Sequence, residues 1–384
     1  MFTEFNMPIK IVFKLGCSES VGKELSAFKS NKAMICTDKG IREAGLLDNI
    51  LVSLKDSGIK YSIFDEVVPN PKIETIQKGF NFFKKEECDS IIAIGGGSPI
   101  DAAKAIGIII SNPGSIEEFE GFNKVKNKIP PIIAIPTTYG TGSEVSCATV
   151  ITHTNKKYKM LIIDNLILPK IALVDPNLSV KLPFSIAAST GMDALTHAIE
   201  SYTSLTSNVF SDALSFHAIK LIAENLSSAA ASDNNIIATS NMIIASTLAA
   251  MSAGTTGYGL VHAIAHSLGG YYDIAHGIAN AILLPHVMEY NYVADPQKFS
   301  SIYEAMGGKC KNGDAFENAE NAIEKVKKLS KLLEIPSNLK EAGVPQIDID
   351  KIAEFALKDG NFGGNIRKSC YKDVVKIINK AYGK

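Results

Sequence analysis

The sequence predicts an α/β half that contains a parallel sheet, followed by a half that is entirely helical. In the first half, short apolar runs alternate with segments of helical periodicity, which indicates parallel strands connected by helices. From about residue 184 the strand-like runs disappear, and apolar side chains recur at helical spacing, as at Ala319, Ala322, Val326, Leu329 and Leu333. We therefore expect two domains, residues 1–183 and 184–384, with a binding cleft between them.

The individual elements of the α/β half can be placed from these runs. Six runs have the length and composition of buried strands: residues 9–13, 33–38, 61–64, 91–94, 132–135 and 171–174. Helical patterns lie between them at residues 41–57, 73–85 and 99–111.

Composition excludes several classes of function. The chain has 384 residues, 46% of them hydrophobic and 21% charged, with a formal net charge of −1. This balance favours an ordinary globular protein and gives no reason to expect nucleic acid or an anionic membrane as a partner. The six cysteines are scattered without a C-x-x-C pair, and the N-terminus lacks the pattern of a signal peptide. No uninterrupted apolar stretch is long enough to cross a bilayer, so we expect a cytoplasmic protein.

Two loops that follow predicted strands are rich in glycine and hydroxyl groups. In the first, Gly95-Gly96-Gly97 is followed by Ser98 and Pro99, which predicts a helix with Ser98 as N-cap. Such a turn lets a phosphate approach backbone N–H groups at the helix start, although a tight turn without a ligand has the same pattern. The second loop, residues 136–144, contains Thr137, Thr138 and Thr141. Two such loops in one sheet favour a nucleotide that spans both.

Histidines are concentrated in one apolar stretch of the second half. Residues 260–286 contain four of the seven histidines, at positions 262, 266, 276 and 286. His262 and His266 share one face of a predicted helix that should end near Gly269-Gly270, and a second apolar run should end at Pro285. A lone buried histidine is usually a core residue, but three or four in one stretch favour a shared divalent metal ion.

A second half-site for this ion lies upstream. Asp193 and His197 are four residues apart on an apolar helical segment, so they share a face. The alternative for Asp193 is a position at the helix start, in a capping box with Thr190. That alternative does not explain His197.

These segments together resemble the iron-containing, or group III, alcohol dehydrogenase family. The resemblance rests on residues 95–104, 136–144, 191–200, 262–270 and 276–280, which occur in family order and extend it over essentially the whole chain. It implies a Rossmann-like nucleotide-binding domain followed by an all-helical metal-binding domain, as in the dehydroquinate synthase-like architecture. It also implies that the metal ligands are Asp193, His197, His262 and His276.

The resemblance further implies where the cofactor lies. Gly95, Gly96, Gly97 and Ser98 would hold the pyrophosphate, with Asp101 in the same motif, while Thr137, Thr138 and Thr141 would line the nicotinamide side. Asp38 would lie by the adenosine ribose, Asn70 by the adenine and Lys159 near the nicotinamide ribose. Without the family pattern, Asp38 and Asn70 would be turn residues and Lys159 a solvated lysine. Because a carboxylate at residue 38 repels a 2′-phosphate, we expect NAD(H) rather than NADP(H).

The implied activity is reversible hydride transfer between a primary alcohol or diol and NAD(P)⁺, with Fe²⁺ or Zn²⁺ as Lewis acid. Four ligands are assigned and a catalytic metal keeps a position open, so His266 is left as a proton carrier beside the substrate. The alternative is that His266 only packs against the nicotinamide.

Two departures from the family leave the alcohol open. Residues 253–256 replace a segment that usually contains phenylalanine, and Tyr139 replaces a small residue. A non-redox dehydroquinate synthase-like lyase and a glycerol dehydrogenase-like polyol dehydrogenase remain alternatives, as does a metal-storage protein. The apolar, alanine-rich second half and the resemblance both favour a homodimer or larger homo-oligomer.

Overall fold

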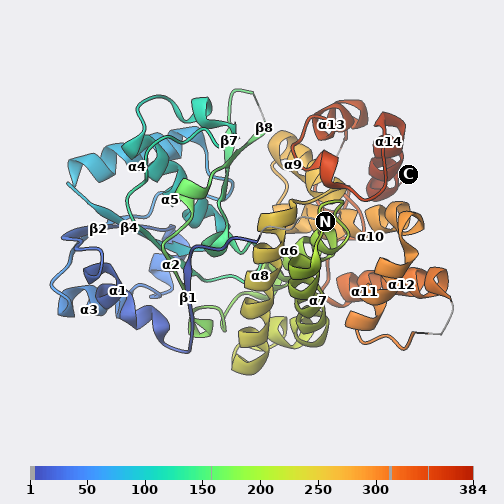
Figure 1. The fold of residues 1–384 in the computed structure, drawn as a ribbon, viewed down its shortest axis with the longest axis horizontal. Coiled ribbons are helices and arrows are strands. Elements are labelled where there is room, and N and C mark those ends of the chain that lie inside the picture. Colours follow the sequence, from blue (N-terminus) through green and yellow to red (C-terminus); the bar gives the residue numbers. More distant parts are fainter. Residues whose placement is uncertain (1–4, 157, 311–313, 345, 384) are drawn as a thin grey trace. The chain divides into compact units, whose positions relative to one another are not determined.

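A computed structural model of the chain describes residues 5–156, 158–310, 314–344 and 346–383 (Figure 1). The chain forms two compact units. One, here called the α/β unit, comprises residues 7–138 and 142–179. The other, here called the helical unit, comprises residues 139–141 and the chain from Val180 onward, together with Phe5 and Asn6.

The α/β unit is built on a six-stranded sheet in which every pairing is parallel, with the order β1-β9-β6-β4-β2-β3. Its strands are β1 (Lys10–Phe13), β2 (Lys32–Cys36), β3 (Lys60–Phe64), β4 (Ser90–Gly95), β6 (Ile132–Pro136) and β9 (Ile171–Val174). All six predicted runs form this sheet. The predicted fold class is confirmed, because this parallel sheet is followed from Phe184 onward by helices alone in the described residues.

Helices cover both faces of this sheet. They are α1 (Val21–Ser26), α2 (Lys39–Glu43), α3 (Asp48–Asp56), α4 (Ile73–Lys85) and α5 (Gly97–Ser111). Alternate side chains of β2 point to opposite faces, so that Met34 packs in the cluster that contains α4 and α5, and Ile35 packs in the cluster that contains α1 and α3. Burial on both faces explains why the strands read as continuous apolar runs.

A smaller sheet of three strands adjoins α5. It consists of β5 (Gly121–Phe122), β7 (Ala148–His153) and β8 (Tyr158–Ile163), with β7 and β8 antiparallel. This hairpin is not among the predicted strands. Its first strand alternates buried and partly buried side chains, which is the pattern of a half-covered strand rather than of a continuous apolar run.

Two predicted helix boundaries in this unit are wrong. The single helix predicted at 41–57 is two helices, α2 and α3, because the chain between them passes through Gly45 at φ 71°, a left-handed conformation that glycine adopts without strain. Helix α5 begins at Gly97 with Gly96 as its N-cap. Ser98 therefore lies within the first turn and is not the N-cap.

The helical unit contains nine helices within the described residues: α6 (Phe184–Tyr202), α7 (Val209–Ala230), α8 (Ile236–Thr256), α9 (Leu260–Tyr272), α10 (His276–Asn291), α11 (Pro296–Ala305), α12 (Ala315–Leu332), α13 (Ile349–Ala356) and α14 (Tyr371–Tyr382). Helix α6 packs against α7, α8 and α10, and α9 packs against α10 and α13. Helix α10 therefore lies beside α6, although the two are far apart in the sequence (Figure 1).

Three expectations about these helices are corrected. Helix α9 continues through Gly269-Gly270 to Tyr272, and its C-cap is Asp273 in the left-handed conformation at φ 54°. Pro285 lies inside α10, so it does not end that helix. Asp193 lies in the middle of α6, and the Thr190 hydroxyl donates to the carbonyl of Ile186, so these two residues form no capping box.

Helix α8 is the one helix in the described part of the chain that is long and apolar enough to cross a membrane. However, 61% of its most apolar window is buried, and it packs closely against α7 and α6. Burial by neighbouring helices is typical of a core helix in a globular protein.

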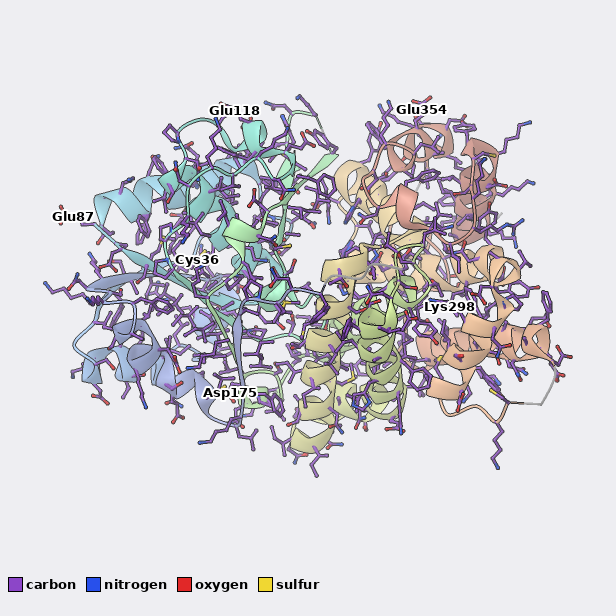
Figure 2. The ribbon with its side chains drawn as sticks, in the orientation of Figure 1. Cys36, Glu87, Glu118, Asp175, Lys298 and Glu354 are labelled. Atoms are coloured by element: carbon purple, nitrogen blue, oxygen red, sulfur yellow. The ribbon has the colours of Figure 1, made fainter. Side chains whose placement is uncertain are left out.

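Charged side chains anchor loops in each unit, and two of them, Lys298 and Asp175, are labelled in Figure 2. In the helical unit, the Lys298 ammonium donates to the Tyr202 carbonyl at 2.6 Å and to the Ser207 hydroxyl at 2.5 Å. In the α/β unit, the Asp175 carboxylate accepts from the Gly16 N–H at 2.9 Å and the Ser18 hydroxyl at 2.7 Å.

Candidate metal centre and active site

Four potential metal ligands converge within the helical unit. One ligand atom from each of Asp193, His197, His262 and His276 lies within 4.8 Å of the other three. The Asp193 Oδ1 atom is 3.7 Å from the Nε2 atoms of both His197 and His276. The four residues predicted as a ligand set are therefore brought together in space.

The local fold explains this convergence. Asp193 and His197 are one turn apart on α6, while His262 lies near the start of α9 and His276 is the first residue of α10. The start of α10 approaches α6 closely, because a Cβ atom on Gly277 would lie 2.3 Å from the Ser189 carbonyl oxygen. Only glycine permits this approach.

Glu200 orients one of the four potential ligands. Its Oε2 lies 2.5 Å from His262 Nδ1, and its Oε1 accepts from the Val261 N–H at 2.6 Å. A carboxylate at Nδ1 favours the tautomer with the proton on Nδ1, which leaves the Nε2 lone pair for a metal ion. Burial raises the pKa of the Glu200 carboxyl to about 7, and burial also lowers the pKa of His262 well below its ordinary value.

An aromatic ring stacks on two of the potential ligands. The Tyr258 ring lies parallel to His262, with 3.9 Å between ring centroids and 12° between planes. It also stacks on His197 at 4.8 Å, and the two imidazoles stack on each other at 4.9 Å. Tyr258 reaches them from the short connection between α8 and α9.

Asn280 places an amide among the same four residues. It lies one turn after His276 on α10 and is fully buried. Its Nδ2 is 2.6 Å from Asp193 Oδ1, 3.2 Å from His276 Nε2 and 3.3 Å from His262 Nε2.

His266 lies beside these ligands but outside the converging set. Its Nδ1 is 2.9 Å from Asp359 Oδ2, and its ring centroid is 5.4 Å from that of His276. The other Asp359 oxygen accepts from the backbone and side-chain nitrogens of Asn361, each at 2.8 Å. His286, the fourth histidine of the stretch, lies further along α10 and takes no part in the set.

The residues present fit a divalent metal ion. Three imidazole nitrogens and one carboxylate oxygen are ligands that Fe²⁺ and Zn²⁺ both accept. Three of the four residues are buried and His276 is partly exposed, and the His262–Glu200 contact directs an Nε2 lone pair toward the other three residues. Buried acceptor atoms that converge in this way are stabilised by a shared cation.

In the α/β unit, the predicted glycine loop joins β4 to α5. Gly95 has φ 144°, and a Cβ atom there would lie 2.6 Å from Pro99 Cγ. Strand β3 lies on one side of β2, and the next strand in the chain, β4, lies on the other side of β2. The strand order therefore reverses between β2 and β4. The carboxyl ends of strands at such a reversal form a crevice that commonly binds nucleotides.

The threonine loop follows the neighbouring strand β6. Thr137 is buried, and its N–H donates to the Gly95 carbonyl at 3.0 Å. Thr138 lies against Gly96, because a Cβ atom on that glycine would be 3.3 Å from the Thr138 side chain. Thr141 belongs to the segment 139–141 of the helical unit, where Gly140 lies against Thr190 of α6.

Asp101 takes part in a buried network of its own. Its carboxylate accepts from the Ser143 hydroxyl at 2.6 Å and the Val150 N–H at 3.0 Å, and Lys104 lies 3.9 Å away. Burial raises the pKa of Asp101 and lowers the pKa of Lys104. These contacts hold α5 against the hairpin. Asp101 therefore has a structural role in addition to the cofactor role predicted for it.

The remaining predicted cofactor residues lie around loops of this unit. Asp38 is the N-cap of α2 and accepts from the Ile41 N–H at 3.0 Å. Asn70 has φ 53°, and its carbonyl accepts from the Thr152 hydroxyl at 3.3 Å. Lys159 pairs with Thr152 across the β7–β8 hairpin, so Asn70 and Lys159 both adjoin Thr152.

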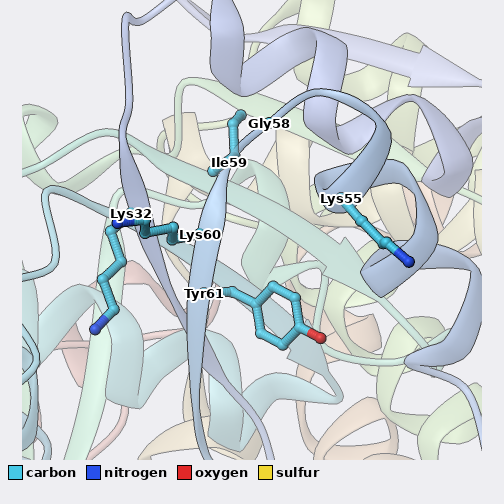
Figure 3. A pocket seen from close by; sticks show the side chains of 6 residues that line it. All are labelled: Lys32, Lys55, Gly58, Ile59, Lys60 and Tyr61. Carbon is cyan, nitrogen blue, oxygen red and sulfur yellow. The ribbon is translucent and has the colours of Figure 1, made fainter.

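A hollow of about 470 Å³ lies elsewhere on this unit (Figure 3). It is lined by Lys32, Lys55, Gly58, Ile59, Lys60 and Tyr61. None of the predicted site residues lines it.

The prediction includes no role for four residues of the centre. Glu200 and Asn280 lie one turn after His197 (three residues) and His276 (four residues), so helical spacing could have identified them. Tyr258 precedes His262 by four residues, but it lies in the connection between α8 and α9, where helical spacing does not apply. Asp359 is separated from His266 by 93 residues, and no local pattern links them.

Comparison with known proteins gives the family. The family model described as "Iron-containing alcohol dehydrogenase" matches residues 8–176. The family model described as "Fe-containing alcohol dehydrogenase family, C-terminal" matches residues 187–382. The chain is 43% identical over 364 residues to the 1,3-propanediol dehydrogenase of Klebsiella pneumoniae, covering 94% of each chain. It is 38% identical over 379 residues to the NAD-dependent methanol dehydrogenase of Bacillus methanolicus, covering 99% and 100% of the two chains.

Solved structures agree with this result. A crystal structure of a 1,3-propanediol oxidoreductase is 41% identical, with a TM-score of 0.96 and full coverage of both chains. The chain therefore belongs to the iron-containing alcohol dehydrogenase family and is an oxidoreductase that acts on the CH–OH group of alcohols.

Proposed function

We propose that Asp193, His197, His262 and His276 bind one divalent ion, Fe²⁺ or Zn²⁺, and that the protein interconverts a primary alcohol or diol and its aldehyde with NAD(H). The observation that carries this proposal is the convergence of the four ligand atoms within 4.8 Å of one another. Such an ion, when bound, lowers the pKa of an alcohol and polarises an aldehyde carbonyl. Residues 184–384 would form the metal-binding domain.

The α/β unit supports a nucleotide site, and we assign residues 1–183 to that domain. Gly95, Gly96, Gly97 and Ser98 offer backbone N–H groups at the start of α5, where a helix favours a phosphate. Thr137, Thr138 and Thr141 follow the adjacent strand, which suits contact with the nicotinamide half. Asn70 and Lys159 would contact the adenine and the nicotinamide ribose.

Preference for NAD(H) over NADP(H) would come from Asp38. This residue follows β2, next to the reversal of strand order, where a ribose of the cofactor would lie. Its carboxylate can accept hydrogen bonds from ribose hydroxyls and repels a 2′-phosphate. The relative from B. methanolicus is itself described as NAD-dependent.

His266 is suited to carry a proton in this reaction. The Asp359 carboxylate at Nδ1 favours the proton on that atom, so Nε2 remains able to accept one. Alcohol oxidation releases a proton from the hydroxyl group, and a histidine that accepts it near neutral pH accelerates the reaction.

The proposed substrate class is based on the relatives. The relative from K. pneumoniae is described as acting on 1,3-propanediol. We assign a short primary alcohol or diol, and we expect a homodimer or larger oligomer in the cytoplasm.

One experiment tests the assignment as a whole. The protein is purified without oxygen, its metal content is measured, and NADH oxidation is followed with a panel of aldehydes and hydroxyaldehydes. We expect about one ion per chain and oxidation of NADH that depends on the aldehyde. A metal-loaded protein that leaves NADH unchanged with every aldehyde, and NAD⁺ unchanged with every alcohol, would favour the lyase alternative. Light scattering that finds only monomer at micromolar concentration would contradict the proposed oligomer.

A further inference from the structure

Asn280 places a side-chain hydrogen-bond donor among the converging ligand atoms. Its amide nitrogen contacts Asp193 Oδ1 at 2.6 Å and faces the Nε2 atoms of His276 and His262 at 3.2 and 3.3 Å. An amide NH₂ group donates two hydrogen bonds and accepts none. One hydrogen is donated to Asp193 Oδ1, and the two Nε2 atoms can only share the other as acceptors.

The tautomer of His262 agrees with this arrangement. Its Nδ1 lies 2.5 Å from the Glu200 carboxylate, so the ring proton belongs on Nδ1 and the Nε2 lone pair faces Asn280. The amide thus donates to a carboxylate oxygen and to imidazole lone pairs. A divalent ion bound by Asp193, His262 and His276 would use the same lone pairs.

We propose that Asn280 is a positioning residue that holds the ligands together before the ion binds and gives up these contacts when it does. This inference rests on the metal site proposed above. Asn280 suits the role because α10 fixes it one turn after His276 and because it is completely buried. Its Oδ1 atom is buried without a hydrogen-bond partner among the described residues, so no acceptor contact fixes the amide against rotation.

Removal of Asn280 should affect ion binding in the opposite way to removal of a residue that stabilises the ion-bound site. If the amide competes with the ion, its removal destabilises the ion-free protein more than the loaded protein. The ion then binds as tightly or more tightly, because binding no longer displaces those hydrogen bonds. A residue that supports the loaded site would instead weaken ion binding when removed.

The test compares Asn280→Leu with Asn291→Leu, using Zn²⁺ as the probe. Asn291 is also a buried asparagine of α10, but its amide donates to Asn365 at 2.8 Å. Melting temperatures are measured after chelator dialysis and again with Zn²⁺, and the Kd for Zn²⁺ is measured by competition with a chromophoric chelator. We expect Asn280→Leu to lower the ion-free melting temperature at least twice as much as the loaded one, with an unchanged or smaller Kd. Asn291→Leu should lower both temperatures equally.

A tenfold larger Kd with an unchanged ion-free melting temperature would overturn the inference. A wild-type protein that binds no Zn²⁺ or Fe²⁺ would instead contradict the metal site itself and the inference with it.

A second measurement uses wild-type protein labelled with ¹⁵N-asparagine, in case Asn280→Leu does not fold. We expect one side-chain NH₂ resonance to exchange slowly with solvent in the ion-free protein and to shift on addition of Zn²⁺. If every side-chain amide resonance stays unchanged, the inference is wrong.

Discussion

The Nδ1 atom of His266 lies 2.9 Å from Oδ2 of Asp359, although the two residues are 93 positions apart in the sequence. Both Asp359 oxygens are engaged, one by His266 and the other by Asn361. Burial by itself would raise the pKa of Asp359, but the nearby His266 and these hydrogen bonds together hold it below its ordinary value. Asp359 therefore acts as a fixed carboxylate that orients the histidine.

We predict that Asp359→Asn lowers turnover by about 10²-fold while metal content and fold remain normal. An asparagine can keep its contact with Asn361 and present an NH₂ group to His266, which places the ring proton on Nε2 instead of Nδ1. Steady-state kinetics and metal analysis test this. Glu354→Gln, a carboxylate-to-amide change at an exposed residue of α13, is the matched control and should leave both values unchanged.

Substitution of His266 itself should separate proton transfer from metal binding. We expect His266→Ala to keep one ion per chain and to lose turnover, with the largest loss in alcohol oxidation at low pH, where solvent base is scarce. Loss of the metal would mean that His266 is a ligand. Normal rates at every pH would favour the alternative in which it only packs against the nicotinamide.

Loss of a ligand should have a different result. We predict that His276→Ala abolishes turnover and strips the ion, because three ligands remain and two of them are neutral imidazoles. Metal analysis after gel filtration and the far-ultraviolet circular dichroism spectrum are the measurements. His217→Ala changes an exposed histidine of α7 outside the set and is the control. A fully metallated and active His276→Ala protein would contradict the ligand assignment.

The role of Asp38 in cofactor choice can be separated from its role as an N-cap. Asp38→Ser removes the charge but keeps an oxygen that can accept from the Ile41 N–H. We expect the preference for NADH over NADPH, measured as the ratio of kcat/KM values, to fall about tenfold, equivalent to 1.4 kcal/mol. Asp48→Ser, at the start of α3, should leave that ratio unchanged. A wild-type preference for NADPH would refute the assignment.

Stability should depend on pH through Glu289. This residue of α10 pairs with Lys327 of α12 at 2.9 Å and with Lys380 of α14 at 3.2 Å. Burial would raise the pKa of Glu289, but the two lysines outweigh it and the net shift is downward. A carboxyl with a depressed pKa stabilises the fold above its unfolded pKa, and this contribution is lost as pH falls through the folded pKa.

Glu289→Gln should therefore destabilise the protein by about 1 kcal/mol at pH 7, a shift in melting temperature of roughly 2–4 °C. The difference from wild type should disappear below the ordinary pKa range of glutamate. Calorimetry at several pH values provides the measurement. A difference that stays constant as the pH falls would show that the ion pairs contribute nothing.

Prediction succeeded where the physical signal is local. The strands of the large sheet are buried on both faces, so each one reads as an unbroken apolar run, as at Ile91–Ile94 within β4. The pairs Asp193–His197 and His262–His266 could be placed on common faces because helical spacing alone determines this.

The errors have equally local causes. Gly45 adopts a left-handed conformation and divides one predicted helix, whereas Gly269 and Gly270 stay helical because packing against α10 and α13 outweighs their weak propensity. Pro285 is accommodated within α10 for a similar reason. The Asp359 partner of His266 depends on tertiary folding alone, so no periodicity could reveal it.

The Tyr258 ring that lies 3.9 Å from His262 has a spectroscopic consequence. The chain contains 12 tyrosines and no tryptophan, so its ultraviolet emission comes from tyrosine. An open-shell ion such as Fe²⁺ held by His262 would quench the excited state of a ring stacked on its ligand, whereas closed-shell Zn²⁺ would leave that ring bright. If the proposed metal site is correct, the tyrosine emission of the protein would differ between its Fe²⁺ and Zn²⁺ forms and would report the bound ion without any added dye.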